Sequence, residues 1–116
     1  MKILITGVSF FTCLHFANRI AKIHKVYELF TKSNLSHYDK IKTDRINKLN
    51  SNISKIYNIN TKEKKIIELI NEKKQDVFCF HGGYTENYNN KKFNLEKFIK
   101  ENTYNFTNII KHLKKK

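Results

Sequence analysis

The chain has 116 residues, of which 40% are hydrophobic and 13% aromatic, so it is long enough for one globular domain and too apolar to be disordered throughout. Its formal net charge is +13, yet nearly all of its 23 basic residues are lysines scattered along the chain. Because arginine is the preferred bidentate reader of phosphates and bases, this distribution favours a compositional bias and argues against a dedicated nucleic-acid-binding face.

The chain begins with an apolar run, residues 2–6, that ends at Gly7, as a short strand buried on both faces would. Apolar residues then recur at helical spacing and predict a helix over residues 11–23; they are Phe11, Leu14, Ala17, Ile20 and Ala21. Many proteins hold a phosphate with a strand, a glycine turn and a helix, because the helix amino terminus offers free amides and a positive dipole end. The opening segment is therefore the first candidate site.

The same apolar run could be mistaken for a signal peptide. His15, Asn18 and Arg19 interrupt it, no small-residue cleavage site follows, and the run is too short to span a bilayer. Cys13 and Cys79 have no metal-ligand spacing and fall in segments expected in the core, which is typical of reduced cysteines in an intracellular protein. We therefore expect a cytoplasmic protein with no membrane partner and no metal.

The middle of the chain is expected to hold two strands and a helix. Residues 26–30 form the second strand and run into a polar loop, whereas residues 38–52 are compatible with a helix or an irregular insertion. Residues 54–59 form the third strand. Thr61 is expected to cap an amphipathic helix whose apolar face is Ile66, Ile67, Leu69 and Ile70.

The last strand is the clearest of the chain. Residues 76–80, DVFCF, form it and run directly into His81-Gly82-Gly83. The remainder, residues 92–114, is expected to be helical, with an apolar face made of Phe98, Ile99, Phe106, Ile109, Ile110 and Leu113.

The alternation of strands and helices predicts the architecture. It indicates one α/β domain over residues 1–116, with a Rossmann-like, doubly wound parallel sheet of about four strands in the order 3-2-1-4 and helices flanking it. Ligands of such sheets bind at the carboxyl ends of the strands. Those ends fall at residues 7–12, 31–33, 58–60 and 81–84, so a site is expected where these four loops meet.

Four segments carry a family resemblance, and they occur in the family's order. They are ITGVSFFTCLHFANRI, VYELFTKS, YNINTKEKKIIELINEKKQDVFCFHGG and ENTYNFTNIIKHLK. The first resembles ITGATGFIGSHLARRL, the second resembles the strand that follows it, the third GDITD…L…L…PDVVFHLAA, and the fourth VNVxGTxNLLEAxK. These are motifs of the extended short-chain dehydrogenases/reductases, the NAD(P)-dependent sugar-nucleotide epimerases and dehydratases. The resemblance covers nearly the whole chain and implies the family's amino-terminal, NAD(P)-binding Rossmann-like domain.

The resemblance implies a dinucleotide site built from loop residues. Gly7 would be the first glycine of the phosphate loop, and Phe11 and Thr12 would lie beside the pyrophosphate at the helix amino terminus. Lys32 and Ser33 would lie beside the adenosine ribose. A cation there, with no acid, slightly favours NADP over NAD as the cofactor, because NADP carries a 2′-phosphate.

The other implied contacts come from the third and fourth strand ends. Asn58 and Ile59 would lie against the adenine, where the family has Asp-Ile. Gly82 and Gly83 replace Ala-Ala and would leave backbone close to the cofactor with no side chain in the way. His81 is either a catalytic base or, more commonly for a strand-end histidine, the partner of a structural hydrogen bond.

Some positions depart from the family. Phe10 replaces the glycine that lets backbone approach the pyrophosphate, so a benzyl group is expected in phosphate space, and Cys13 replaces the glycine that permits close helix–strand packing. The family's acid–base Tyr-x-x-x-Lys lies beyond a fifth strand, past the end of this sequence. Two pairs match its spacing but lie in other elements and are set aside: Tyr38/Lys42 and Tyr88/Lys92.

The leading functional hypothesis is a dinucleotide-binding domain of a truncated or degenerate sugar-nucleotide epimerase, dehydratase or reductase, with no catalytic residue and no turnover of its own. A sugar nucleotide would bind only if a substrate-binding half exists. The alternative is a non-catalytic Rossmann-like module that binds a protein or an acidic polymer through its lysine-rich surface. Nucleic-acid binding is a third hypothesis that only the charge supports.

Overall fold

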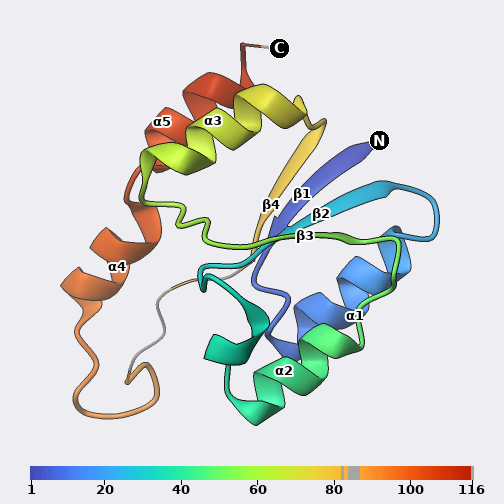
Figure 1. Ribbon diagram of the computed structural model, residues 1–116. Coiled ribbons are helices and arrows are strands. Elements are labelled where there is room, and N and C mark those ends of the chain that lie inside the picture. Colours follow the sequence, from blue (N-terminus) through green and yellow to red (C-terminus); the bar gives the residue numbers. More distant parts are fainter. Residues whose placement is uncertain (82, 84–86, 116) are drawn as a thin grey trace.

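The computed structural model of the protein describes residues 1–81, 83 and 87–115. Its strands are β1 (Lys2–Thr6), β2 (Lys25–Leu29), β3 (Ser54–Ile56) and β4 (Val77–Phe80). Its α-helices are α1 (Phe11–Ile20), α2 (Lys40–Asn47), α3 (Lys64–Lys73), α4 (Leu95–Thr103) and α5 (Phe106–Leu113), and a 3₁₀ turn spans Leu35–His37 (Figure 1).

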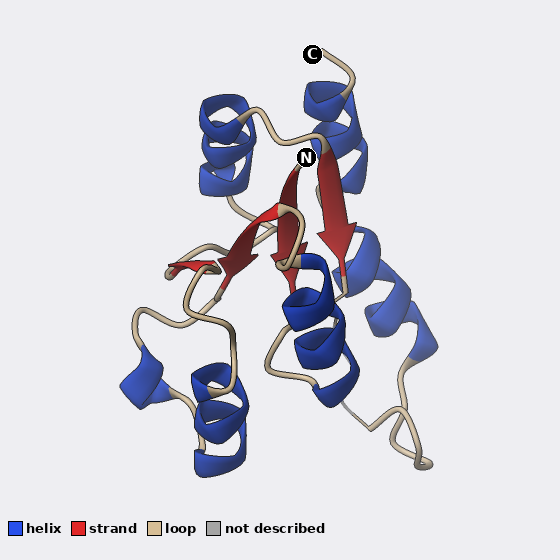
Figure 2. Cartoon of the chain, turned by 90° about the vertical axis from the view of Figure 1, so that its right-hand side faces the viewer, coloured by secondary structure: helices blue, strands red, loops and turns tan. Residues whose placement is uncertain are grey.

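The four strands form one parallel sheet in the order β3-β2-β1-β4, which confirms the predicted order and a Rossmann-like α/β fold. Figure 2 shows the strand arrows running in the same direction, so that their carboxyl ends lie toward one edge of the sheet. In the register, Ile5 of β1 lies between Glu28 of β2 and Cys79 of β4.

Two apolar cores lie on the two faces of the sheet, because β1 is covered on both sides. Ile3 and Ile5 pack with α1 and α2 on one face, whereas Leu4 packs with α3 and α5 on the other (Figure 1). All three side chains are at most 6% exposed. Successive side chains of β1 thus enter opposite cores, which is why the segment is a continuous apolar run.

The segment that the sequence left open, residues 38–52, contains a helix. Asp39 caps α2, and its side chain accepts a hydrogen bond from the Lys42 amide at 2.9 Å. Ile46 is the fully buried residue of this helix and joins the core of α1. The capping carboxylate and one deeply buried contact are what favour the helix over an irregular insertion.

The third strand is shorter than predicted. It ends at Ile56, and Asn58 has a left-handed φ of 60°, which takes the chain out of the extended conformation. The backbone still follows β2, since the Asn58 amide donates to the Lys32 carbonyl and the Ile59 amide to the Phe30 carbonyl, both at 2.9 Å. The prediction of a strand to residue 59 is therefore wrong in conformation, although those residues lie beside β2.

Two helix boundaries also differ from prediction. The first helix ends at Ile20 instead of residue 23. Helix α3 begins at Lys64, and its N-cap is Glu63 instead of the predicted Thr61. Asn60 is the reason: its side chain and carbonyl accept the amides of Lys62 and Glu63, both at 3.0 Å, and this local turn delays the helix.

The predicted carboxy-terminal helix is two helices. Tyr104 ends α4 with an extended ψ of 134°, and Asn105 before α5 has a left-handed φ of 63°. The break turns α5 back against α3, where Ile109 is 2% exposed. The residues of α4 are all described, and none of them is buried. A continuous apolar stripe in the sequence therefore splits into one packed and one exposed helix.

In the part of the chain that the structure describes, no helix combines the length and the apolar character needed to cross a membrane.

Candidate functional site

A pocket of about 380 Å³ opens where the carboxyl ends of β1 and β2 meet the residues that precede α3. It is lined by residues 6–10, 29–32 and 59–62, by Phe80 at the end of β4 and Gly83 after it, by Tyr38 and Lys42, and by Glu101 and Asn102 of α4. This is the edge of the sheet at which the loop positions predicted a site.

The loop between β1 and α1, residues 7–10, is called the glycine turn below. Gly7 has a φ of 89°, a left-handed conformation that favours glycine, and its carbonyl accepts the Phe10 amide at 3.0 Å. Phe10 is the N-cap of α1, and no side chain among the described residues caps it. The helix therefore begins beside the pocket with backbone amides that no side-chain cap occupies.

Two distant side chains hold the glycine turn. The Val8 amide donates to Oε1 of Glu28 at 3.1 Å, and Arg45 of α2 donates to the Ser9 carbonyl at 3.0 Å. Burial raises the pKa of the Glu28 carboxyl to about 9, although the Val8 amide opposes this. Glu28 is therefore a neutral acid near pH 7.

Lysines dominate the charge around the pocket. Lys32, Lys42 and Lys62 line it, one each from the loop after β2, from α2 and from the segment before α3. Glu101 is the single carboxylate among the described lining residues, and it forms an ion pair with Lys62. Lys42 lies 3.9 Å from Asp39. The pocket therefore carries a net positive charge, which suits a phosphorylated ligand.

An apolar wall completes the pocket on the β2 side. Phe30 is 3% exposed and stacks on Tyr57, with ring centroids 4.8 Å apart, while the Tyr38 ring meets it edge-on at 6.1 Å. Ile59 is 9% exposed on the same wall. The Tyr38 hydroxyl accepts the Lys32 amide at 3.2 Å, which fixes the loop after β2. An aromatic and aliphatic surface beside lysines is the composition that an adenosine phosphate would need.

Half of the residues predicted for the site line the pocket. They are Gly7, Phe10, Lys32, Ile59 and Gly83.

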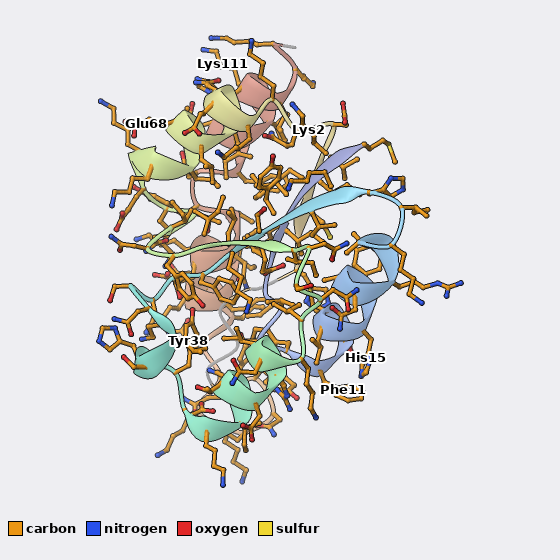
Figure 3. The ribbon with its side chains drawn as sticks, turned by 45° about the vertical axis from the view of Figure 1, so that its right-hand side comes forward. Lys2, Phe11, His15, Tyr38, Glu68 and Lys111 are labelled. Carbon is orange, nitrogen blue, oxygen red and sulfur yellow. The ribbon has the colours of Figure 1, made fainter. Side chains whose placement is uncertain are left out.

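Four other predicted residues lie outside the pocket lining. Phe11 is 63% exposed and its ring packs against His15 at 4.5 Å. Figure 3 shows these two side chains together on α1, apart from Tyr38. Thr12 is exposed on the same helix turn, Ser33 bonds to His37 at 2.8 Å, and Asn58 is exposed beside Lys32. Gly82 lies outside the described residues.

Gly83 makes room for a side chain of the protein itself. A Cβ at this position would lie 2.5 Å from Oδ1 of Asn102 on α4. The side chain of Asn102 thus occupies part of the space beside Gly83, where the resemblance implies a cofactor. Polar contacts hold this part of α4 at the pocket: the Lys62–Glu101 ion pair, and Asn105, whose side chain donates to the Thr61 carbonyl at 3.0 Å.

Sequence reasoning missed several pocket residues. Tyr38 and Lys42 both line the pocket, although the pair was set aside as a chance match to a catalytic spacing. Lys62 and Asn102 were not singled out. Their signal in the sequence is weak, because each lies in an element whose position depends on packing. Glu28 is not in the pocket lining but holds the glycine turn, and it could have been found, since it is a lone acid inside the apolar strand VYELF.

His81 forms a main-chain hydrogen bond, and both cysteines are free thiols. The His81 main-chain amide donates to the Thr6 hydroxyl at 3.2 Å, a bond in which the imidazole takes no part, so both roles of the side chain stay predictions. Cys13 is a buried free thiol whose pKa is raised to about 12, chiefly by burial, and Cys79 is a half-buried free thiol. Within the described residues, no cluster of three or more His, Cys, Asp or Glu could hold a metal ion.

Comparison with known proteins adds no assignment: no protein-family model matches the chain, and no curated protein sequence matches it.

Proposed function

We propose that the pocket binds a dinucleotide of the NADP type and that the chain does not turn it over by itself. The observation that carries the proposal is the lysine triad, Lys32, Lys42 and Lys62, around a pocket that opens beside the glycine turn and the start of α1. The resemblance of four ordered segments to the extended short-chain dehydrogenases supports it. The predicted cytoplasmic location belongs to the same proposal.

The residues present fit the parts of such a ligand. The apolar wall of Phe30 and Ile59 suits an adenine ring, and Lys32 with Lys42 suits the phosphate that distinguishes NADP from NAD. The glycine turn and the first amides of α1 suit the pyrophosphate. When bound, such a group would supply hydride transfer; the chain's own residues bind and orient it.

A titration of the purified chain with NADP⁺ and NAD⁺ by calorimetry tests the proposal. NADP⁺ is expected to bind about tenfold more tightly, because the 2′-phosphate gains charge-assisted hydrogen bonds. Lys32→Ala should remove most of this preference. Lys22→Ala is the matched control, because Lys22 is an exposed lysine outside the pocket lining. Absence of binding for both cofactors, or tighter binding of NAD⁺, would overturn the proposal.

Phe10 provides a second test. It lines the pocket, is 38% exposed and stands where the family has a glycine. If its ring competes with the pyrophosphate, Phe10→Ala should tighten NADP⁺ binding about tenfold. Phe16→Ala controls for the loss of an exposed phenylalanine from α1 outside the pocket lining. Weaker binding by Phe10→Ala would instead make the ring part of the binding surface.

Turnover is tested separately with NADPH and a panel of 4-keto sugar nucleotides, followed by the absorbance of the reduced cofactor. We expect no change, since a general acid or base alone typically contributes about 10²–10⁴ in rate and neither pair that matches the Tyr-x-x-x-Lys spacing lies in the family's catalytic element. Oxidation that disappears in Gly7→Trp would contradict this expectation, and Tyr38 in the pocket would then be the first proton donor to test.

A non-catalytic interaction module is the second candidate. The observation that favours it is the surplus of basic over acidic residues, 23 against 10, which suits binding of an acidic polymer. If the chain binds polyglutamate and shows no binding of NADP⁺, this candidate is supported over the first.

A further inference from the structure

The carboxyl group of Glu28 is an unusual feature of the core. Glu28 lies in β2 and is 0% exposed. It is the register partner of Ile5 in β1, so the two side chains lie on the same face of the sheet. Its Oε1 accepts the Val8 amide at 3.1 Å, and its Oε2 has no hydrogen-bond partner among the described residues. A charged residue is almost never fully buried unless it is paired.

Among the described residues, Glu28 has no counter-charge in an ion pair. Cys13 of α1 and Cys79 of β4 are close enough for a negative charge on Glu28 to raise the pKa of both thiols, second to burial itself. Arg45 of α2, a cation that also holds the glycine turn, donates to the Ser9 carbonyl. Within the described residues Glu28 forms no ion pair, so ionisation would leave a carboxylate unpaired in an apolar core.

The hydrogen bond of Glu28 acts on the pocket through the glycine turn. Val8 follows Gly7, both residues line the pocket, and the Val8 amide is a buried donor that depends on Glu28 Oε1. An unpaired buried carboxylate is strongly destabilised, so the ionised side chain must leave the core or admit water. Departure of the side chain removes the acceptor that holds the turn at Val8, whereas entry of water keeps that hydrogen bond but opens the core beside the turn.

We propose that Glu28 is a positioning residue: as a neutral acid it holds the glycine turn in the shape that forms the pocket, and its ionisation releases the turn and weakens ligand binding. The ligand part of this inference rests on the proposed function, whereas the coupling between Glu28 and the turn does not. The proposal stands on the Val8 hydrogen bond, the complete burial of the side chain and the lack of a counter-charge among the described residues.

The first experiment observes the turn without a ligand. The amide resonance of Val8 in the full chain is followed by nuclear magnetic resonance between about pH 7 and pH 10, in the wild type and in Glu28→Gln. The glutamine keeps a carbonyl acceptor for Val8 but cannot ionise. The Val8 amide is expected to titrate with a midpoint near 9 in the wild type and to stay constant in Glu28→Gln. Glu68→Gln, a change at an exposed glutamate of α3, is the matched control and should titrate like the wild type.

The second experiment measures binding of NADP⁺ and of inorganic pyrophosphate over the same pH range. With a midpoint near 9, only about a tenth of the carboxyls stay neutral at pH 10, so wild-type affinity should fall about tenfold more than that of Glu28→Gln. Any pH dependence that the two proteins share cancels in the comparison of wild type with Glu28→Gln.

The outcomes separate the two proposals. A Val8 amide that does not titrate in the wild type, or that titrates equally in Glu28→Gln, overturns the role of Glu28. Equal loss of affinity in both proteins also overturns it. If neither ligand binds at any pH while Val8 titrates only in the wild type, the proposed function is overturned and the hold of Glu28 on the turn is supported.

Discussion

Helices α1 and α4 are each the next α-helix after a strand, yet they pack differently. Cys13, Leu14 and Ala17 of α1 are at most 3% exposed, whereas α4, which is described throughout, buries no residue. The strand before α1, β1, lies inside the sheet, while β4 lies at its edge and pairs only with β1 among the described residues. An amphipathic pattern therefore predicts a helix, but the strands and helices that lie next to that helix decide how much of its apolar face is buried.

The pocket joins these two regions. Its floor and apolar wall come from the packed region of β1, β2 and α2, and Glu101 and Asn102 of α4 form part of its rim. Polar contacts, above all the Lys62–Glu101 ion pair, attach that rim. Exposed ion pairs typically contribute about 0–1 kcal/mol, so the packed region should determine the stability and α4 should modulate binding.

The largest difference is expected between matched apolar truncations. Leu14→Ala in α1 should lower the free energy of unfolding by about 2–5 kcal/mol, because it leaves a cavity in the core. Ile99→Ala in α4, where the side chain is 52% exposed, should change it by less than about 0.5 kcal/mol. Urea unfolding measures both. An equal loss for Ile99→Ala would mean that α4 is covered in solution and would break the comparison.

The second prediction concerns the pH dependence of the packed region. The folded-state pKa of Glu28, about 9, lies above the ordinary glutamate value of 4.5, so the unfolded chain releases this proton at lower pH than the folded one. The free energy of unfolding should therefore be highest, as far as this group is concerned, below about pH 4.5 and fall as pH rises toward 9.

Glu28→Gln should remove this fall and be more stable than the wild type at pH 7 by roughly 1–3 kcal/mol. Urea midpoints between about pH 5 and pH 8 check it, a range below the titration of the thiols. The same slope in both proteins would contradict a neutral, buried Glu28.

Two glycines of the pocket provide the third prediction. Gly7→Ala should lower stability by roughly 1–2 kcal/mol, because Gly7 has a φ of 89° in the packed region. Gly83→Ala should cost less, since Gly83 is not among the described residues with a positive φ and the new Cβ meets only side-chain atoms of Asn102. Thermal unfolding of both variants checks the order, and a larger loss for Gly83→Ala would show that Asn102 is held more firmly than its place on α4 suggests.

The smallest effect is expected at the rim. Glu101→Gln breaks the ion pair with Lys62 and should change stability by less than about 1 kcal/mol. It frees a pocket lysine, so NADP⁺ affinity should rise about threefold. Glu96→Gln in the same helix, outside the pocket lining, is the control and should leave affinity unchanged. A fall in affinity would mean that the ion pair shapes the rim more than it neutralises Lys62.

The sequence by itself determined the strand order and the edge at which the pocket opens. Apolar runs and helical spacing are local signals, and the right-handed crossover between parallel strands leaves few ways to connect them. Gly7 could also be predicted from the sequence, because its turn needs a backbone conformation that few residues other than glycine adopt. Half of the predicted site residues line the pocket because loops at strand ends follow from strand order.

Only the tertiary structure decided which side chains share the pocket and which carboxyl is buried. Tyr38, Lys42 and Lys62 lie there because α2 and the turn at Asn60 pack beside β2, which no local pattern encodes. The break at Asn105 arises where α5 turns back to bury Ile109 against α3. Glu28 is neutral because strands and helices from distant parts of the chain close over it, and burial is a property of the assembled core.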